Sequence, residues 1–271
     1  MRDGTRQRGR SSAIGGFTLI ELLIVVALIS ILMSLLVPCV GMAREMARRA
    51  VCAGHQHHIY TALNMYLVKH RSLPSLTRSP DIVVPPEGQA GLANADLRRT
   101  PWDLFPVIYH GNNLGPEHSY FTNFGALYEH RYVEDIRLFF CPSQTHPDFQ
   151  FDTPTNPWPI EDPEPIEADF KRWNHVFSSY GRRLGLSNIS FDTVEPQTAI
   201  VSDVAMFPWY TRTHHKDLGF NVLTADGAVT WNNDPWYHTH FDEYDDYSFF
   251  DAIRHCIDVF DRLSGIRRGD D

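Results

Sequence analysis

The residue with the most unusual chemical setting in this 271-residue chain is Glu21. It is the one ionisable side chain within residues 17–37, a run that is otherwise apolar apart from threonine and serine and that contains no glycine or proline. A carboxylate that enters a lipid bilayer without a partner is costly, so a plain membrane anchor gains nothing from it. We therefore expect Glu21 to meet a positive charge at the same membrane depth.

Cleavage between Gly16 and Phe17 would create that positive charge. It would leave a free α-amine on Phe17, four residues before Glu21, and the carboxylate could neutralise the amine of its own chain or of a neighbouring chain. An unpaired subunit would then carry an energetic penalty that docking removes. This chemistry predicts a role in assembly for Glu21 and no role in catalysis.

The element that carries Glu21 is predicted to be a membrane-spanning helix, since roughly 20 apolar residues suffice to cross a bilayer. Residues 1–16, which contain four arginines and one aspartate, form a basic leader. Three interpretations are open. The segment is a simple signal anchor, or a secretory signal that is cut after the small residues Gly41 and Ala43 to give a mature N-terminus near residues 42–44, or a precursor cut at Gly16.

The octapeptide GFTLIELL at residues 16–23 resembles the processing site of type IV prepilins and type II secretion pseudopilins. In that family a prepilin peptidase cuts after the glycine and methylates the new N-terminal phenylalanine. The resemblance implies a single pass through the cytoplasmic (inner) membrane, with the leader inside and the C-terminal region outside. It also implies later assembly with other pilin-like subunits, through the N-terminal helix, into an extracytoplasmic filament.

Residues 38–72 are predicted to continue the same helix, because they are rich in alanine, methionine, arginine and leucine. We expect one helix over residues 17–70, kinked at Pro38 and stopped by Pro74. Pilins resemble this arrangement as well: the first half of the helix packs into the filament, and the second half packs under a sheet.

Residues 73–271 are predicted to form an extracytoplasmic globular domain with an antiparallel sheet and large loops, which makes the whole chain an α+β, pilin-like protein. The patterns predict a short amphipathic helix at 123–133, a strand at 137–141 and a buried strand at 197–203. Asp226 and Gly227 separate two β-favouring runs, which predicts a hairpin with a two-residue type I′ turn.

The C-terminal region is also similar to the large pilin-like proteins of planctomycete-type bacteria, which carry a His-x9-Asp-Gly signature. Here His215 precedes Asp226 by one position too many, and Lys216 occupies the place of the expected histidine. The role of His215 and of Lys216 therefore stays open.

Two further groups of residues could bind a metal or form a covalent link. His238, His240 and Asp242 are types that ligate metals, and Ca²⁺ is one candidate, with a solvated acidic loop as the alternative and no cofactor required. A compartment outside the cytoplasm permits disulfides. We favour Cys52 with Cys141, because the helix should lie against the strand that holds Cys141; the alternative is buried, reduced thiols.

Composition argues against several functions. The formal net charge of −9 makes nucleic acid an improbable partner. The sequence contains no nucleophile elbow, P-loop, HExxH or dinucleotide-binding fingerprint, so we predict that the chain is not an enzyme. The predicted function is that of a structural subunit of a type IV pilus-like or type II secretion pseudopilus filament. A membrane-tethered binding protein or hydrolase, or a secreted enzyme with a removable signal, is the alternative.

Overall fold

The computed structural model divides the chain into two compact units, Met1–Arg44 and Glu45–Asp271. The second unit begins within the long helix. The domain boundaries predicted from the sequence stay a prediction. The residues that the structure describes are 17–74, 107–110, 120–158, 175–183, 191–203, 213–233 and 259–265.

The first unit consists, in its described part, of the beginning of helix α1 (Leu19–His70). Large apolar side chains between Phe17 and Val40 are exposed on all sides of this helix. A helix that is apolar all round requires an apolar surrounding, and by length and composition α1 is able to cross a membrane. The helix continues through Pro38, so the proline does not end it, and the kink expected there stays a prediction.

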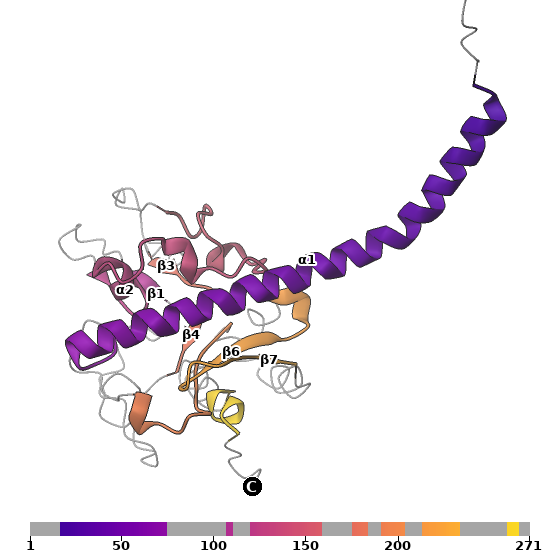
Figure 1. Cartoon of the computed structure of the whole chain (residues 1–271). Coiled ribbons are helices and arrows are strands. Elements are labelled where there is room, and N and C mark those ends of the chain that lie inside the picture. The colour runs from indigo at the N-terminus through magenta and orange to yellow at the C-terminus, as the bar shows by residue number, and fades with distance from the viewer. Residues whose placement is uncertain are drawn as a thin grey trace, which may run out of the picture. The chain divides into compact units, whose positions relative to one another are not determined.

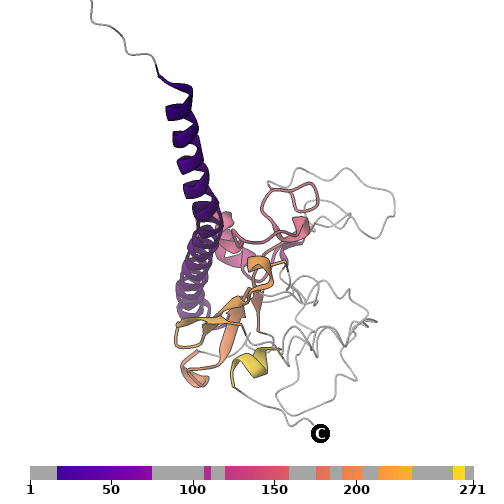
Figure 2. The same cartoon turned by 90° about the vertical axis from the view of Figure 1, so that its right-hand side faces the viewer.

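The second half of α1, residues 45–70, belongs to the second unit and lies beside both of its sheets (Figures 1 and 2). Its buried positions recur at helical spacing and therefore form one face. The face mixes apolar and polar side chains, namely Glu45, Cys52, Gln56, Ile59, Ala62 and Leu63. The one long helix predicted from composition is thus confirmed, and its second half is a part of the core.

Two antiparallel sheets form the body of the second unit, which confirms the α+β class. The smaller sheet has the order β2-β1-β3 and the larger the order β4-β5-β6-β7. The strands are β1 (Val107–His110), β2 (Tyr120–Phe121), β3 (His175–Phe177), β4 (Gly181–Arg182), β5 (Ala199–Ser202), β6 (Phe220–Thr224) and β7 (Val229–Asn232). The strand β5 is buried along its whole length and matches the buried strand predicted at 197–203.

The strand predicted at 137–141 is wrong, because this segment forms the 3₁₀ helix η4 (Ile136–Phe139). Asp135 caps the turn by accepting a hydrogen bond from the Arg137 amide at 3.0 Å. Phe140 then leaves the turn in an extended conformation. The local cap therefore outweighs the β-favouring aromatic residues, and the chain reaches Cys141 from a turn.

The amphipathic helix predicted at 123–133 is present as the short helix α2 (Gly125–Glu129). Gly125 allows α2 to lie directly against β1, since a Cβ atom at this position would sit 1.8 Å from the backbone oxygen of Ile108. Phe124, just before the helix, stacks on Phe139 of η4 with 5.9 Å between the ring centroids. Helix α2 thereby joins η4 to the smaller sheet.

The hairpin around Asp226 and Gly227 is present as β6 paired with β7, but its turn differs from the prediction. The Thr224 amide donates to the Ala228 carbonyl at 2.9 Å, so three residues close the loop. Gly227 has a φ of +85°, whereas Asp226 does not have a positive φ, so the turn is not type I′. It is a three-residue loop with glycine in the left-handed position, and the Asp226 carboxylate stabilises it by accepting from the Ala228 amide.

Candidate functional site

The N-terminal end of α1 holds the Glu21 carboxylate back against the first turn. Thr18 donates to Glu21 Oε2 from its amide at 2.8 Å and from its hydroxyl at 2.7 Å, and the Glu21 amide donates to Thr18 Oγ1 at 3.3 Å. This is a reciprocal capping box. The Glu21 carboxylate is therefore hydrogen-bonded to Thr18, the residue that directly follows Phe17. The nitrogen of Phe17 would become the new N-terminus after cleavage.

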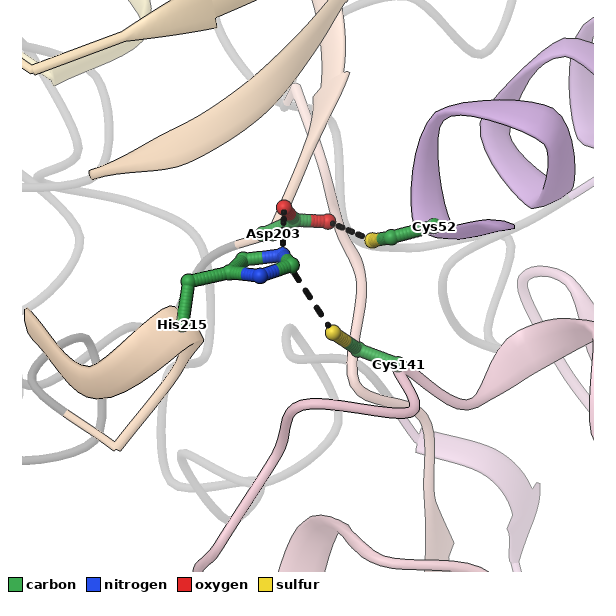
Figure 3. Close-up of side chains that lie close together, drawn as sticks. All are labelled: Cys52, Cys141, Asp203 and His215. Carbon is green, nitrogen blue, oxygen red and sulfur yellow. Dashed lines mark hydrogen bonds and ion pairs between the residues drawn. The ribbon is translucent and has the colours of Figure 1, made fainter. Parts of the chain in front are cut away.

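A second candidate site lies inside the second unit, where thiol, carboxylate and imidazole groups converge (Figure 3). One ligating atom from each of four residues lies within 4.8 Å of the corresponding atoms of the other three, and all four residues are buried. They come from α1, from the loop after η4, from the end of β5 and from the turn before β6, and are Cys52, Cys141, Asp203 and His215.

Asp203 is the hub of this cluster. Its Oδ1 accepts from the Cys52 thiol at 2.7 Å and from Gln56 Nε2 at 2.8 Å. Its Oδ2 lies 3.0 Å from His215 Nε2 and accepts from the Asn221 amide at 2.8 Å. The Asp203 amide donates to the Asn221 carbonyl, which extends the β5–β6 ladder by one residue and fixes the direction of the side chain.

His215 connects the cluster to Glu45. Its Nδ1 lies 2.7 Å from Glu45 Oε1, and its Nε2 faces both Asp203 and the Cys141 sulfur, the latter at 3.5 Å. Both nitrogens therefore donate to carboxylates. The ring is further packed edge-on against Trp231, with centroids 5.3 Å apart.

An unusual backbone places the His215 ring. His215, Lys216 and Asp217 have φ values of 46°, 58° and 61°, so three successive non-glycine residues are left-handed. Such residues cost of order 1–3 kcal/mol each and persist where the surroundings hold them. Lys216, the residue in the position of the expected histidine, is exposed, whereas His215 is fully buried.

The environment shifts the acid–base equilibria of the cluster. Burial lowers the pKa of His215, but hydrogen bonds to Asp203 and Cys141 outweigh it and raise that pKa to about 10. Burial opposes ionisation of Asp203 and of Glu45, yet their bonds to His215 hold the pKa of each carboxyl below its usual value. Burial raises the pKa of the Cys52 thiol well above its usual value.

Cys141 is the more acidic of the two thiols. Burial opposes its ionisation, but the interactions with the neighbouring Cys52 and His215 side chains lower its pKa to about 6. A thiolate beside an imidazolium is a nucleophile in cysteine enzymes. Here Cys141 and His215 are 4% and 0% exposed, so the Cys141 sulfur is not presented to solvent. The His215 nitrogen that faces this sulfur, Nε2, is also hydrogen-bonded to Asp203. The arrangement suits an ion bound inside the protein better than a substrate.

The two cysteines that we predicted to pair lie close together, with Cys52 on α1 as expected and Cys141 in the loop after η4 instead of on a strand. Both thiols are free in the structure. Cys52 is directed at Asp203 and Tyr180, while Cys141 is directed at His215 and accepts from the Ser143 amide at 3.4 Å. The disulfide stays a prediction that competes with the arrangement seen here.

Sequence reasoning missed two members of the site and left one without a role. Asp203 and Glu45 were not singled out, and His215 was noted only for its displaced register. A single carboxylate directly after a wholly buried strand is a signal that could have identified Asp203. The three candidate metal ligands His238, His240 and Asp242 lie outside the described residues, as does Gly16.

Comparison with known proteins characterises the N-terminal segment. Residues 12–37 match the family model of the prokaryotic N-terminal methylation motif. No curated protein and no solved structure matches the chain significantly. The chain therefore carries the segment of a type IV prepilin- or pseudopilin-like precursor, and the long apolar helix that follows fits this assignment. The motif is consistent with a structural pilin-type protein, and it concerns residues 12–37 alone.

Proposed function

We propose that the chain is a structural subunit of a type IV pilus-like or type II secretion pseudopilus filament. A prepilin peptidase cuts it after Gly16 and methylates Phe17. Before assembly it resides in the cytoplasmic membrane, with its leader inside and the second unit outside. The match to the methylation motif over residues 12–37 carries this proposal.

The geometry of α1 supports the assembly step. Apolar side chains surround Glu21, so in a bilayer or a filament the carboxylate needs a cationic partner. The capping box already directs it towards the N-terminal end of the helix, where the amine of Phe17 would appear. The Glu21 carboxylate can then leave the Phe17 amine of its own chain and pair with the Phe17 amine of a neighbouring subunit.

Mass spectrometry of the N-terminus of the native protein tests the proposal. The expected mature chain begins with N-methylated Phe17. A chain that begins near residues 42–44 would instead identify a removable secretory signal, and a chain that retains residues 1–16 would identify a simple anchor. Either of these results would refute the proposed processing.

A further inference from the structure

We propose that the second unit is built around a structural zinc site, in which Zn²⁺ is bound by Cys52, Cys141, Asp203 and His215. This inference is independent of filament assembly, because it concerns the interior of the second unit alone. It also assigns a role to the histidine whose register departs from the expected signature.

The spacing of the four groups is close to that of a tetrahedral site. Zinc bonds of about 2.0–2.3 Å separate neighbouring ligand atoms by about 3.3–3.8 Å. Cys141 Sγ lies 3.5 Å from His215 Nε2, and this nitrogen lies 3.0 Å from Asp203 Oδ2. All four ligand atoms fall within 4.8 Å of one another, so the group is compact enough for a single ion.

Hydrogen bonds link the proposed ligands to one another in the metal-free arrangement. The Cys52 thiol donates its hydrogen to Asp203 Oδ1, and the Nε2 hydrogen of His215 is directed at Asp203 Oδ2. Zinc replaces such hydrogens when it binds, since thiolate and neutral imidazole are the ligating forms. Zinc would therefore take the place of hydrogen bonds that already join three of the four groups, while Cys141 Sγ lies 3.5 Å from His215 Nε2.

The groups behind the ligands are those that a zinc site requires. A ligating histidine commonly donates its second nitrogen to a carboxylate, which orients the ring. Glu45 accepts from His215 Nδ1 at 2.7 Å and is itself held by the Ser143 hydroxyl at 2.8 Å. Gln56 and Asn221 hold the Asp203 carboxylate in the same way.

The ligand types select the metal. Two sulfurs and one imidazole suit zinc and related transition metals, whereas Ca²⁺ requires six to eight oxygens. Four protein ligands with no exposed member correspond to a closed, structural site. A metal at this position would cross-link α1, the loop after η4, and the larger sheet.

A disulfide or a purely polar core explains less of the structure. A Cys52–Cys141 disulfide needs neither a fully buried carboxylate nor a buried imidazole beside it, yet Asp203 and His215 are both 0% exposed. Burying charged groups is expensive, and an apolar core of the same volume is often as stable. The strained backbone at residues 215–217 adds a further cost that a bound ion would offset.

Metal analysis of the full chain, purified in detergent without chelators, tests the site. We expect one zinc ion per chain, lost to background in Cys141→Ser and in Asp203→Asn. Cys39→Ser is the matched control, because Cys39 is an exposed thiol outside the cluster, and this variant should retain the ion. Circular dichroism establishes that each variant is folded.

A second measurement does not depend on variants. Protein produced in cobalt-supplemented medium should show the intense visible bands of tetrahedral Co²⁺ and a near-ultraviolet thiolate-to-cobalt band. Three results would overturn the proposal: a wild-type chain two hydrogens lighter with a Cys52–Cys141 disulfide, free thiols without any metal or cobalt spectrum, or zinc retained by folded Cys141→Ser.

Discussion

At the scale of single residues, Glu21 has two roles that can be separated. It caps the first turn through Thr18, and in the proposed filament it pairs with the amine of Phe17. Replacement Glu21→Ala removes both, whereas Thr18→Ala removes the threonine side chain of the capping box and keeps the charge. The two variants therefore distinguish capping from charge pairing.

We predict that Glu21→Ala is cleaved normally but falls to background in sheared filament fractions, because its amine would enter the apolar surrounding unpaired. Immunoblots of membrane and filament fractions measure this. Thr18→Ala should be incorporated at close to the wild-type level. Equal loss in both variants would show that the cap, and not the charge, is what assembly requires.

Gly16 permits a prediction on processing. In the proposed site the peptidase accepts this position because it lacks a side chain. Gly16→Leu should therefore accumulate as the uncut precursor, which a gel shift detects. Gly15→Leu, one position earlier, is the control and should be cut. Normal cleavage of Gly16→Leu would move the site elsewhere.

At the scale of elements, the contact between α2 and β1 depends on Gly125. Its Cβ would overlap the Ile108 carbonyl, whereas a Cβ on Gly54 of α1 meets nothing within 4 Å. We predict that Gly125→Ala lowers the free energy of unfolding by about 3 kcal/mol or more. Gly54→Ala should raise it by up to about 1 kcal/mol. Urea unfolding of the detergent-solubilised chain measures both, and an unchanged midpoint for Gly125→Ala would contradict the observed packing.

The elements that were predictable are those that local sequence determines. Composition alone defines α1, and the short apolar run at residues 199–201 marks β5. The turn η4 was not predictable from its aromatic residues, because the Asp135 cap decides it. The buried cluster was not predictable either. Glu45 and His215 are 170 positions apart, and no local sequence pattern indicates that their side chains are in contact.

At the scale of the whole molecule, α1 is shared between the two units. Ile59 and Leu63 of its second half are fully buried in the core. Each contributes roughly 1.5–3 kcal/mol through burial. A globular domain defined from residue 73 onward would lack both, together with Cys52 and Glu45.

We therefore predict that a polypeptide of residues 45–271 is soluble and folds cooperatively, and that one of residues 73–271 does not. Near-ultraviolet circular dichroism and limited proteolysis distinguish the two. A cooperative, protease-resistant 73–271 fragment would show that the helix is dispensable to the core.

The continuity of α1 from Leu19 to His70 has a mechanical consequence. A tether of flexible residues would lengthen under load before the attached domain felt any force. In this chain, tension applied to the first turns of α1 would be transmitted along the helical backbone to the side chains that hold the sheets. The resistance of the chain to a pulling force therefore depends on contacts inside the second unit, where Cys52 and Gln56 donate hydrogen bonds to Asp203.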